Sequence, residues 1–308
     1  MGSSLGLWHY LTLQGHTVTL LSPTDYGHFL HWLPGNAEVV VFTDDMERGY
    51  AILEASDTIF GLDFSTLARA NEIGDWMKTN HNGRQFIMMD HHLNPEDWAD
   101  YRIWDSGASS TAELVYRFID GCGDSSIINE AIAECLYTGI MTDTGSFKYS
   151  NTSPAVHRIV ANLLERGAIS DMIHNRLFDS ATESRIRFLG FCLYEKLVIL
   201  PQYKTAYMAI SHEELEKFDS QTGDTEGLVN YALSIMGINF GVLIVDRKVL
   251  RKMSFRSIGQ FPANQFAAHF NGGGHYNAAG GMSEDTLENT EKKFLNLLEQ
   301  YKEQLQYE

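Results

Sequence analysis

The chain has 308 residues and a formal net charge of −17 at pH 7. Because long nucleic acids are bound largely by Lys and Arg side chains that neutralise phosphates, this charge argues against a protein that tracks along a long duplex or strand. It leaves room for a small phosphorylated ligand if bound metal ions supply positive charge. No apolar stretch has the roughly 20 residues that a membrane-spanning helix needs.

The three cysteines, Cys122, Cys135 and Cys192, are widely spaced and odd in number. They argue against a disulfide framework and fit a reducing compartment. The first residues lack a basic segment followed by an apolar core, so no signal peptide is evident. We expect a cytoplasmic protein without membrane partners.

The first part of the chain alternates helices and strands. In chain order the pattern predicts a helix at 3–14, strands at 17–22 and 39–42, a helix at 44–56, a strand at 57–63, a helix at 68–79, a strand at 85–90, and helices at 111–120, 128–143 and 154–168. This alternation predicts an α/β domain, residues 1–185, with a mostly parallel sheet and helices on both faces.

The pattern changes after about residue 185. We expect a hairpin at 195–211, a helix at 226–235, two strands within 238–257 and a closing helix at 285–305. This order predicts a smaller α+β domain, residues 195–308. The segment 169–190 has mixed polarity and is interpreted as the connector.

Acids and histidines stand at the ends of the predicted strands. Asp63 ends one strand, and Asp90, His91 and His92 end another. Ligands of parallel sheets bind outside the carboxyl ends of the strands, so these side chains can share one crevice, and the loop at Asp143 can add a third acid. Each acid alone also fits a turn or a helix cap, and the histidine pair fits a structural cluster. A metal site and a structural cluster both remain open on these residues.

The donor types narrow the choice of metal. Carboxylates with one or two imidazoles suit Mn²⁺ or Mg²⁺, and no cysteine pair has the spacing of a zinc finger. Two such ions about 3.5–4 Å apart can clamp the attacking and leaving oxygens of phosphoryl transfer.

A glycine cluster, NGGGHYNAAGG at 271–281, is the second feature that indicates a ligand. Consecutive glycines let backbone amides turn toward an anion and let it approach closely. The predicted strand just before it ends in Arg256, which can hold a phosphate through two hydrogen bonds, and Ser257. A tight turn beside a surface arginine is the alternative.

These segments together resemble the DHH phosphoesterase family, in the branch with a C-terminal DHH-associated domain. The resemblance is carried by DHH at 90–92, LDFS at 62–65, SGASSTAELVY at 106–116, TGIMTDTGSF at 138–147 and GGGH at 272–275. It extends over nearly the whole chain and is closest to the bacterial nanoRNase and 3′-phosphoadenosine-5′-phosphate phosphatase members.

The resemblance implies roles for individual residues. Asp63 would bridge two Mn²⁺ ions, with His91 and Asp143 as further ligands. Asp90 would support the cluster, and His92 would contact the scissile phosphate and help the leaving oxygen depart. The terminal nucleotide would be held by residues of the second domain: Arg256, Ser257, Gly272, Gly273, Gly274 and His275.

The family's first motif, one His and two Asp after the first strand, has no counterpart in the sequence. The chain begins with MGSSLGL, which resembles the helix that follows that motif. A gene start assigned at an internal Met codon, a shortened version of the protein, or true degeneration would explain the difference. Asp63, His91 and Asp143 would then hold at most one ion weakly, so we expect this chain to be a weak or inactive enzyme.

The function predicted from these observations is metal-dependent hydrolysis of short oligoribonucleotides, of 3′-phosphoadenosine-5′-phosphate, or of both. Hydrolysis of cyclic or linear dinucleotides and nucleotide binding without catalysis are the alternatives. Pyrophosphate or polyphosphate hydrolysis fits less well, because the pyrophosphatase branch lacks GGGH. The resemblance also suggests a possible homodimer.

Overall fold

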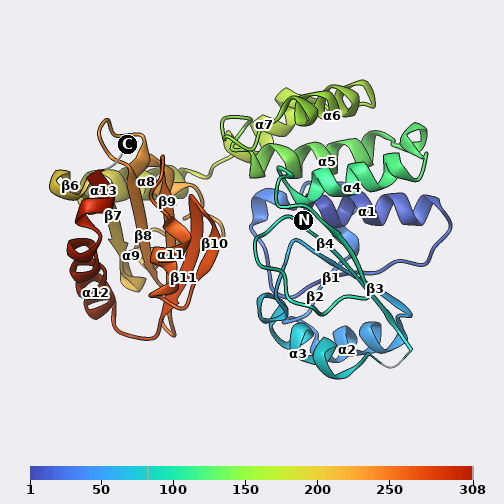
Figure 1. The fold of residues 1–308 in the computed structure, drawn as a ribbon, viewed down its shortest axis with the longest axis horizontal. Coiled ribbons are helices and arrows are strands. Elements are labelled where there is room, and N and C mark those ends of the chain that lie inside the picture. The colour runs from blue at the N-terminus through green and yellow to red at the C-terminus, as the bar shows by residue number, and fades with distance from the viewer. Residues whose placement is uncertain (82, 307–308) are drawn as a thin grey trace. The chain divides into compact units, whose positions relative to one another are not determined.

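The computed structural model describes residues 1–81 and 83–306, which form two compact units, Met1–Ser180 and Ala181–Glu308 (Figure 1). The first unit has a two-stranded and a three-stranded sheet, the second unit has one six-stranded sheet, and each unit has its own hydrophobic clusters. Within the two described ranges, no helix combines the length and the apolar character needed to cross a membrane.

The first unit contains seven helices and five strands among the residues that the structure describes. In chain order they are α1 (Gly2–Leu13), β1 (Leu20–Ser22), β2 (Val39–Val41), α2 (Met46–Ala55), β3 (Thr58–Leu62), α3 (Asn71–Thr79), β4 (Gln85–Asp90), β5 (Tyr101–Trp104), α4 (Thr111–Gly121), α5 (Glu130–Asp143), α6 (Pro154–Glu165) and α7 (Ser170–Phe178). All its strand pairs are parallel: β1 with β2, and β3 with β4 and β4 with β5.

Strand β4 is buried between two layers of helices. Met89 belongs to a cluster with side chains of α1, α4 and α5, whereas Phe86 and Met88 belong to a cluster with side chains of α2 and α3. Figure 1 shows these two groups of helices on opposite sides of the strands. Alternation along a strand sends successive side chains to opposite faces, so an apolar run is needed where both faces are covered.

The predicted α/β class, with parallel strands and helices on both faces, is confirmed for this unit. The predicted helices and strands are present, although the strand predicted at 17–22 is shortened to β1 and the helix predicted at 68–79 begins as a 3₁₀ turn. Edge strand β5 was not predicted, and the segment interpreted as a connector, 169–190, is largely helical, since it contains α7 and most of α8.

The second unit contains α8 (Glu183–Phe191), a π-helical turn at Cys192–Lys196, β6 (Leu197–Leu200), β7 (Thr205–Ile210), α9 (His212–Lys217), α10 (Leu228–Leu233), β8 (Phe240–Asp246), β9 (Arg251–Ser257), α11 (Ala263–Ala268), β10 (Gly273–His275), β11 (Ala278–Ser283), α12 (Leu287–Gln300) and α13 (Lys302–Gln306). Its six strands form one mixed sheet in the order β10-β11-β9-β8-β7-β6, in which β7 and β8 are parallel and the other pairs antiparallel.

Both faces of this sheet are covered. Phe255 of β9 packs with Phe266 of α11 and Phe294 of α12, whereas Leu243 of β8 packs with side chains of α8, α9 and α10. The predicted hairpin and the two strands within 238–257 are confirmed. Helices α9 and α11 were not predicted, and the closing helix is interrupted at Tyr301. The observed mixture of helices and a mostly antiparallel sheet confirms the α+β class.

Candidate metal and phosphate site of the first unit

Two parallel strands and one helix end at the same place in the first unit. Leu62 of β3 is paired with Met89 of β4, so Asp63 and the Asp90-His91-His92 segment follow at the same edge of the sheet. The Asp63 amide also donates to the Met89 carbonyl at 3.1 Å. Asp143 is the last residue of α5, so a helix end, and not a strand end, supplies the third acid.

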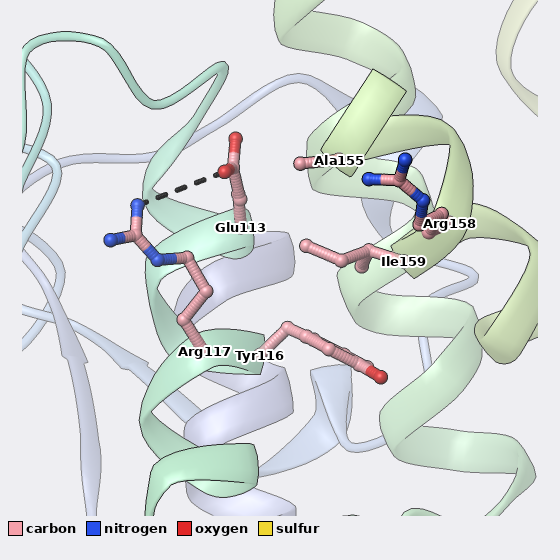
Figure 2. Close-up of a pocket in the computed structure, with 6 residues that line it drawn as sticks. All are labelled: Glu113, Tyr116, Arg117, Ala155, Arg158 and Ile159. Atoms are coloured by element: carbon pink, nitrogen blue, oxygen red, sulfur yellow. Dashed lines mark ion pairs between the residues drawn. The ribbon is translucent and has the colours of Figure 1, made fainter. Parts of the chain in front are cut away.

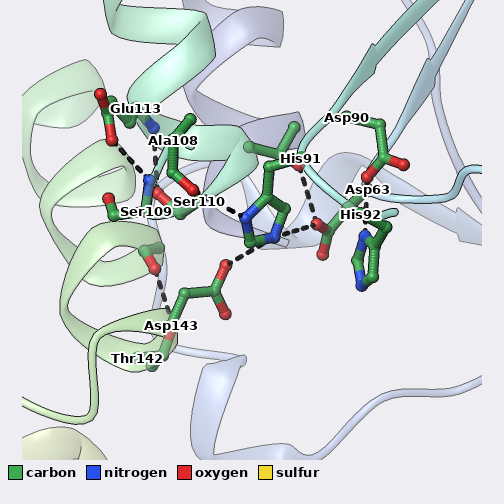
Figure 3. Close-up of polar contacts among 12 residues, drawn as sticks. Asp63, Asp90, His91, His92, Ala108, Ser109, Ser110, Glu113, Thr142 and Asp143 are labelled. Carbon is green, nitrogen blue, oxygen red and sulfur yellow. Dashed lines mark hydrogen bonds and ion pairs between the residues drawn. The ribbon is translucent and has the colours of Figure 1, made fainter. Parts of the chain in front are cut away.

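Three of the predicted ligands face one another (Figure 3). His91 Nε2 lies 3.6 Å from Asp63 Oδ1 and 3.8 Å from Asp143 Oδ2, and one donor atom from each of the three residues lies within 4.8 Å of the others. Ligand atoms about 2.1 Å from a common ion are about 3–4 Å apart, so this spacing suits a shared divalent cation.

The charges of this cluster also fit a cation. Burial, and then the charge of Asp63, raise the pKa of Asp143 to about 8. Burial acts to raise the pKa of Asp63 as well, but the imidazole of His92, the N-terminal amino group, the Thr111 hydroxyl and the imidazole of His91 together lower it. Two carboxylates held this close repel each other when both are ionised, and a divalent ion between them relieves that repulsion.

The imidazole of His91 is oriented as a metal ligand. Its Nδ1 lies 3.2 Å from the carbonyl oxygen of Ala108, which can only accept, so Nδ1 carries the proton and Nε2 is the unprotonated donor atom. Burial lowers the pKa of His91, which keeps the ring neutral. A neutral imidazole with Nε2 turned toward two carboxylates is the form that binds a metal.

Asp63 is held in an unusual backbone conformation, with φ of 68°. Non-glycine residues in this left-handed region are uncommon, and such strain concentrates at functional sites. The Thr111 hydroxyl, at the start of α4, donates to Asp63 Oδ1 at 2.8 Å. The backbone conformation and the Thr111 hydrogen bond therefore both fix the position of the Asp63 carboxylate.

Asp90 and His92 form a second pair beside the first cluster. Asp90 is fully buried, and its Oδ1 accepts a 2.7 Å hydrogen bond from His92 Nδ1. Its Oδ2 is buried and has no hydrogen-bond partner among the described residues. Donor atoms of Asp63, Asp90 and His92 also lie within 4.8 Å of one another, so Asp63 belongs to both groups.

The predicted phosphate-binding residues of the second unit lie at the end of β9 and on or directly before β10. Arg256 Nη1 donates to the carbonyls of Phe255 at 2.9 Å and Ala279 at 3.4 Å. Ser257 is buried, and its hydroxyl donates to the Phe261 carbonyl at 2.6 Å and accepts from Asn277. The Ser257 proton is thus already used within the unit.

The surroundings of the three glycines at 272–274 differ, so glycine is not required at each of them for the same reason. A Cβ on Gly272 would lie 2.1 Å from the Gly280 carbonyl oxygen, and Gly274 has φ of 142° with the Ala278 oxygen 2.7 Å from its Cβ position. Gly273 has open space around it and is exposed. The close approach of β10 to β11 therefore requires two of the three glycines, and His275 ends β10.

The sequence indicated the segment 106–116 only as a motif and gave its residues no role. In the structure it supplies the Ala108 carbonyl to His91 and the Thr111 hydroxyl to Asp63. The spacing of Ser110 and Glu113 at the start of a helix is the one available signal, because it is typical of an N-terminal cap. Ser110 Oγ accepts the Glu113 amide at 3.0 Å.

Models of two known protein families match this chain, one in each unit. The model of the DHH family N-terminal domain matches residues 1–140, and that of the DHHA1 domain matches residues 202–304. The crystal structure of an exopolyphosphatase-related protein from Bacteroides fragilis has 38% identity and a TM-score of 0.92, over 99% of this chain and 89% of that one.

Two relatives bear the name bifunctional oligoribonuclease and PAP phosphatase NrnA. The Bacillus subtilis protein is 30% identical over 65% of this chain, and the match spans 63% of its own length, less than two thirds. The Thermus thermophilus protein is 29% identical over 91% of this chain and 79% of its own length. The chain belongs to the DHH family, as a member in which a DHHA1 domain follows the DHH domain.

Proposed function

We propose that this protein is a metal-dependent phosphoesterase that hydrolyses short oligoribonucleotides and 3′-phosphoadenosine-5′-phosphate. The observation that carries the proposal is the convergence of Asp63, His91 and Asp143, whose donor atoms lie within 4.8 Å of one another at the end of two parallel strands. Membership of the DHH family and the activities for which the NrnA relatives are named support the choice of reaction.

Asp63, His91 and Asp143 would hold Mn²⁺, with Mg²⁺ as the alternative, because their oxygen and imidazole donors suit these ions. Asp63 belongs to both candidate groups and would therefore contribute a ligand to an ion held by either of them. When bound, such ions neutralise phosphate charge and lower the pKa of water.

His92 would assist the departure of the leaving oxygen. Its Nδ1 proton is held by the buried carboxylate of Asp90, which fixes the orientation of the ring. A His92 ring held in this way can contact the scissile phosphate and deliver the proton on Nε2 to the departing oxygen.

The second unit would hold the terminal nucleotide. Arg256 can bind a phosphate through two parallel hydrogen bonds, and the exposed backbone at Gly273 allows close approach of an anion. The same part of the second unit also contains the other predicted residues, Ser257, Gly272, Gly274 and His275. Because the Ser257 proton is used by Phe261, we assign this hydroxyl to shaping the turn.

The acidic net charge of −17 supports small substrates in place of long strands. The test is hydrolysis, followed by product chromatography, of linear diadenylate, 3′-phosphoadenosine-5′-phosphate, cyclic diadenylate and pyrophosphate, each with Mn²⁺ and with EDTA. We expect Mn²⁺-dependent release of AMP from the first two, at the low rate that the sequence-based expectation of a weak enzyme implies. Hydrolysis of pyrophosphate alone, or metal-independent binding of diadenylate without products, would contradict the proposal.

Cell location and assembly state remain predictions. We propose a cytoplasmic protein that forms a homodimer, following the sequence-based expectation. Cell fractionation and light scattering of the purified chain test the two statements separately.

A further inference from the structure

The carboxylate of Glu113 is almost fully buried, with the residue 5% exposed, and it lies away from the proposed metal ligands (Figure 3). Its Oε2 accepts a 2.7 Å hydrogen bond from the amide of Ser109 (Figure 3). Ser109 directly follows Ala108, whose carbonyl oxygen lies 3.2 Å from His91 Nδ1. One peptide unit therefore joins Glu113 to His91, with its carbonyl side on the histidine and its amide side on the glutamate.

The rest of this loop is also fixed by hydrogen bonds. The Asp105 carbonyl accepts the Ala108 amide at 3.0 Å, and its side chain accepts the Gly107 amide at 2.9 Å. Arg117 lies 2.8 Å from the Asp105 carboxylate and 3.8 Å from that of Glu113, so one guanidinium joins the two acids that hold the start and the end of the loop.

A groove of about 410 Å³ runs beside this pair, between α4 and α6 (Figure 2). Its lining includes Glu113, Arg117 and Arg158, and Figure 2 shows the Glu113–Arg117 ion pair along one wall. Glu113 Oε2 binds the Ser109 amide and Oε1 faces the half-exposed Arg117, so the two oxygens have different partners. A substitution can therefore alter the Glu113–Arg117 ion pair without removing the Glu113–Ser109 hydrogen bond.

We propose that Glu113 is a positioning residue for the metal site: by holding the 108–109 peptide, it fixes the Ala108 carbonyl that keeps the proton on His91 Nδ1 and leaves Nε2 for the metal. The polarity of the 108–109 peptide supports this role. A peptide whose amide is bound by a carboxylate is polarised, and its carbonyl becomes a better acceptor for the imidazole proton. Without Glu113 the buried Ser109 amide would lack its partner, and the peptide would be free to turn.

The test compares Glu113→Ala with Glu113→Gln, because glutamine keeps an oxygen that can accept the Ser109 amide. Two readouts other than catalysis are used: Mn²⁺ affinity by calorimetry, and the tautomer of His91 by ¹⁵N NMR of the metal-free chain. The His91 signal is assigned with a His91→Asn variant. Asn129→Ala is the matched control, because it removes another helix cap, at the start of α5, where Asn129 Oδ1 accepts the Ile132 amide.

We expect His91 to be protonated at Nδ1 in the unaltered chain. Glu113→Ala should weaken Mn²⁺ binding about 10-fold or more and raise the population protonated at Nε2, as is typical when an outer hydrogen-bond partner of a ligating histidine is lost. Glu113→Gln should restore both readouts to within about threefold of the unaltered chain, since the hydrogen bond is kept. Asn129→Ala should lower the melting temperature and leave both readouts unchanged.

Unchanged affinity and tautomer in Glu113→Ala would overturn the inference, and so would a Glu113→Gln variant as impaired as Glu113→Ala. If Glu113→Ala does not fold, the tautomer of the unaltered chain and the Gln variant decide, and Nε2 protonation in the unaltered chain would contradict the inference. The inference rests on the proposed metal site. Absence of Mn²⁺ binding by the unaltered chain would refute that site, whereas the tautomer in the metal-free chain still tests Glu113.

Discussion

The hydroxyl of Thr111 donates a 2.8 Å hydrogen bond to Oδ1 of Asp63, joining the first residue of α4 to the residue that follows β3. The same short segment that ends in Thr111 also presents the Ala108 carbonyl to His91. The start of α4 therefore orients two of the three proposed ligands, one through a side chain and one through the backbone.

The first prediction concerns this hydroxyl. Thr111→Val keeps the shape of the side chain but removes the donor to Asp63. Mn²⁺ affinity should fall about 10-fold, because outer partners of metal ligands typically contribute 10–100-fold. Calorimetric titration with Mn²⁺ measures the change. Thr111→Ser retains the hydroxyl and serves as the control, and equal affinities of the Val and Ser variants would contradict the role assigned to Thr111.

The second prediction concerns the two carboxylates in the absence of metal. The raised pKa of Asp143 means that the folded chain holds this proton more tightly than the unfolded chain, whose carboxyl titrates near about 3.9. The contribution of Asp143 to stability should therefore decrease as the pH rises from about 4 to about 8. Asp143→Asn removes this loss, so in EDTA the variant should be more stable than the unaltered chain at pH 8.

Thermal unfolding in EDTA at pH 5 and pH 8 measures this difference. The Asp143 side chain is 39% exposed, so solvent screens part of the repulsion and the gain should be modest. The advantage of Asp143→Asn should be larger at pH 8 than at pH 5. The same variant should lose Mn²⁺ binding, since a charged ligand is replaced. An advantage that shrinks as the pH rises would contradict the pKa argument.

The third prediction concerns the contact between α4 and α5. A Cβ added to Gly139 of α5 would lie 2.6 Å from the Cβ of Ala112 on α4. Gly139→Ala should push the two helices apart and destabilise the protein by about 1–3 kcal/mol, the usual cost of overpacking. Because α4 carries Thr111 and α5 carries Asp143, Mn²⁺ affinity should fall as well.

Gly121→Ala is the matched control for this substitution. Gly121 ends α4, and a Cβ there has no atom within 4 Å. This change should be neutral or stabilise the helix by up to about 1 kcal/mol, because alanine restricts the unfolded chain. Denaturant unfolding and Mn²⁺ titration of both variants give the comparison. Equal stability and equal Mn²⁺ affinity of the two variants would show that the close α4–α5 contact at Gly139 does not matter for either property.

The fourth prediction separates substrate binding from metal binding. Arg256→Ala should raise KM for diadenylate about 10-fold or more, as expected for a lost charged hydrogen bond, while Mn²⁺ affinity stays unchanged. Lys252→Ala, on the same face of β9, is the control and should leave both values unchanged. Equal KM values for the two variants would remove Arg256 from the proposed nucleotide site.

The fifth prediction concerns the Asp90–His92 pair. Asp90→Asn should lower kcat about 10-fold or more with little effect on KM, because a buried amide no longer fixes the orientation of the His92 ring as the carboxylate does. A change confined to KM would indicate that Asp90 acts on substrate binding and not on the leaving oxygen.

Part of this site could be predicted from the sequence. The apolar run at 85–90 indicated a buried strand, and the parallel arrangement then placed Asp63 and His91 at one edge. The third candidate ligand, Asp143, lies beside them at the end of α5, where the helix predicted at 128–143 also ends. Residue type and spacing were sufficient to predict these side chains as candidate ligands, because their own carboxylate and imidazole groups would bind the metal.

The supporting contacts could not be predicted in the same way. The oxygen that orients His91 belongs to the backbone of Ala108, and a carbonyl leaves no residue-type signal. Strand β5 was missed because it is an edge strand with exposed Tyr101 and Trp104, which breaks the apolar pattern of a buried strand. Helices α7 and α8 were missed because their polar residues face solvent and leave few buried apolar positions to show a helical period.

The most direct test of the central claim is an anomalous difference map, recorded at the manganese absorption edge, from crystals of the chain grown with Mn²⁺. The account predicts a peak about 2.0–2.3 Å from oxygens of Asp63 and Asp143 and from Nε2 of His91. Mn²⁺ bound only elsewhere, or no peak at these three side chains at a saturating Mn²⁺ concentration, would contradict it.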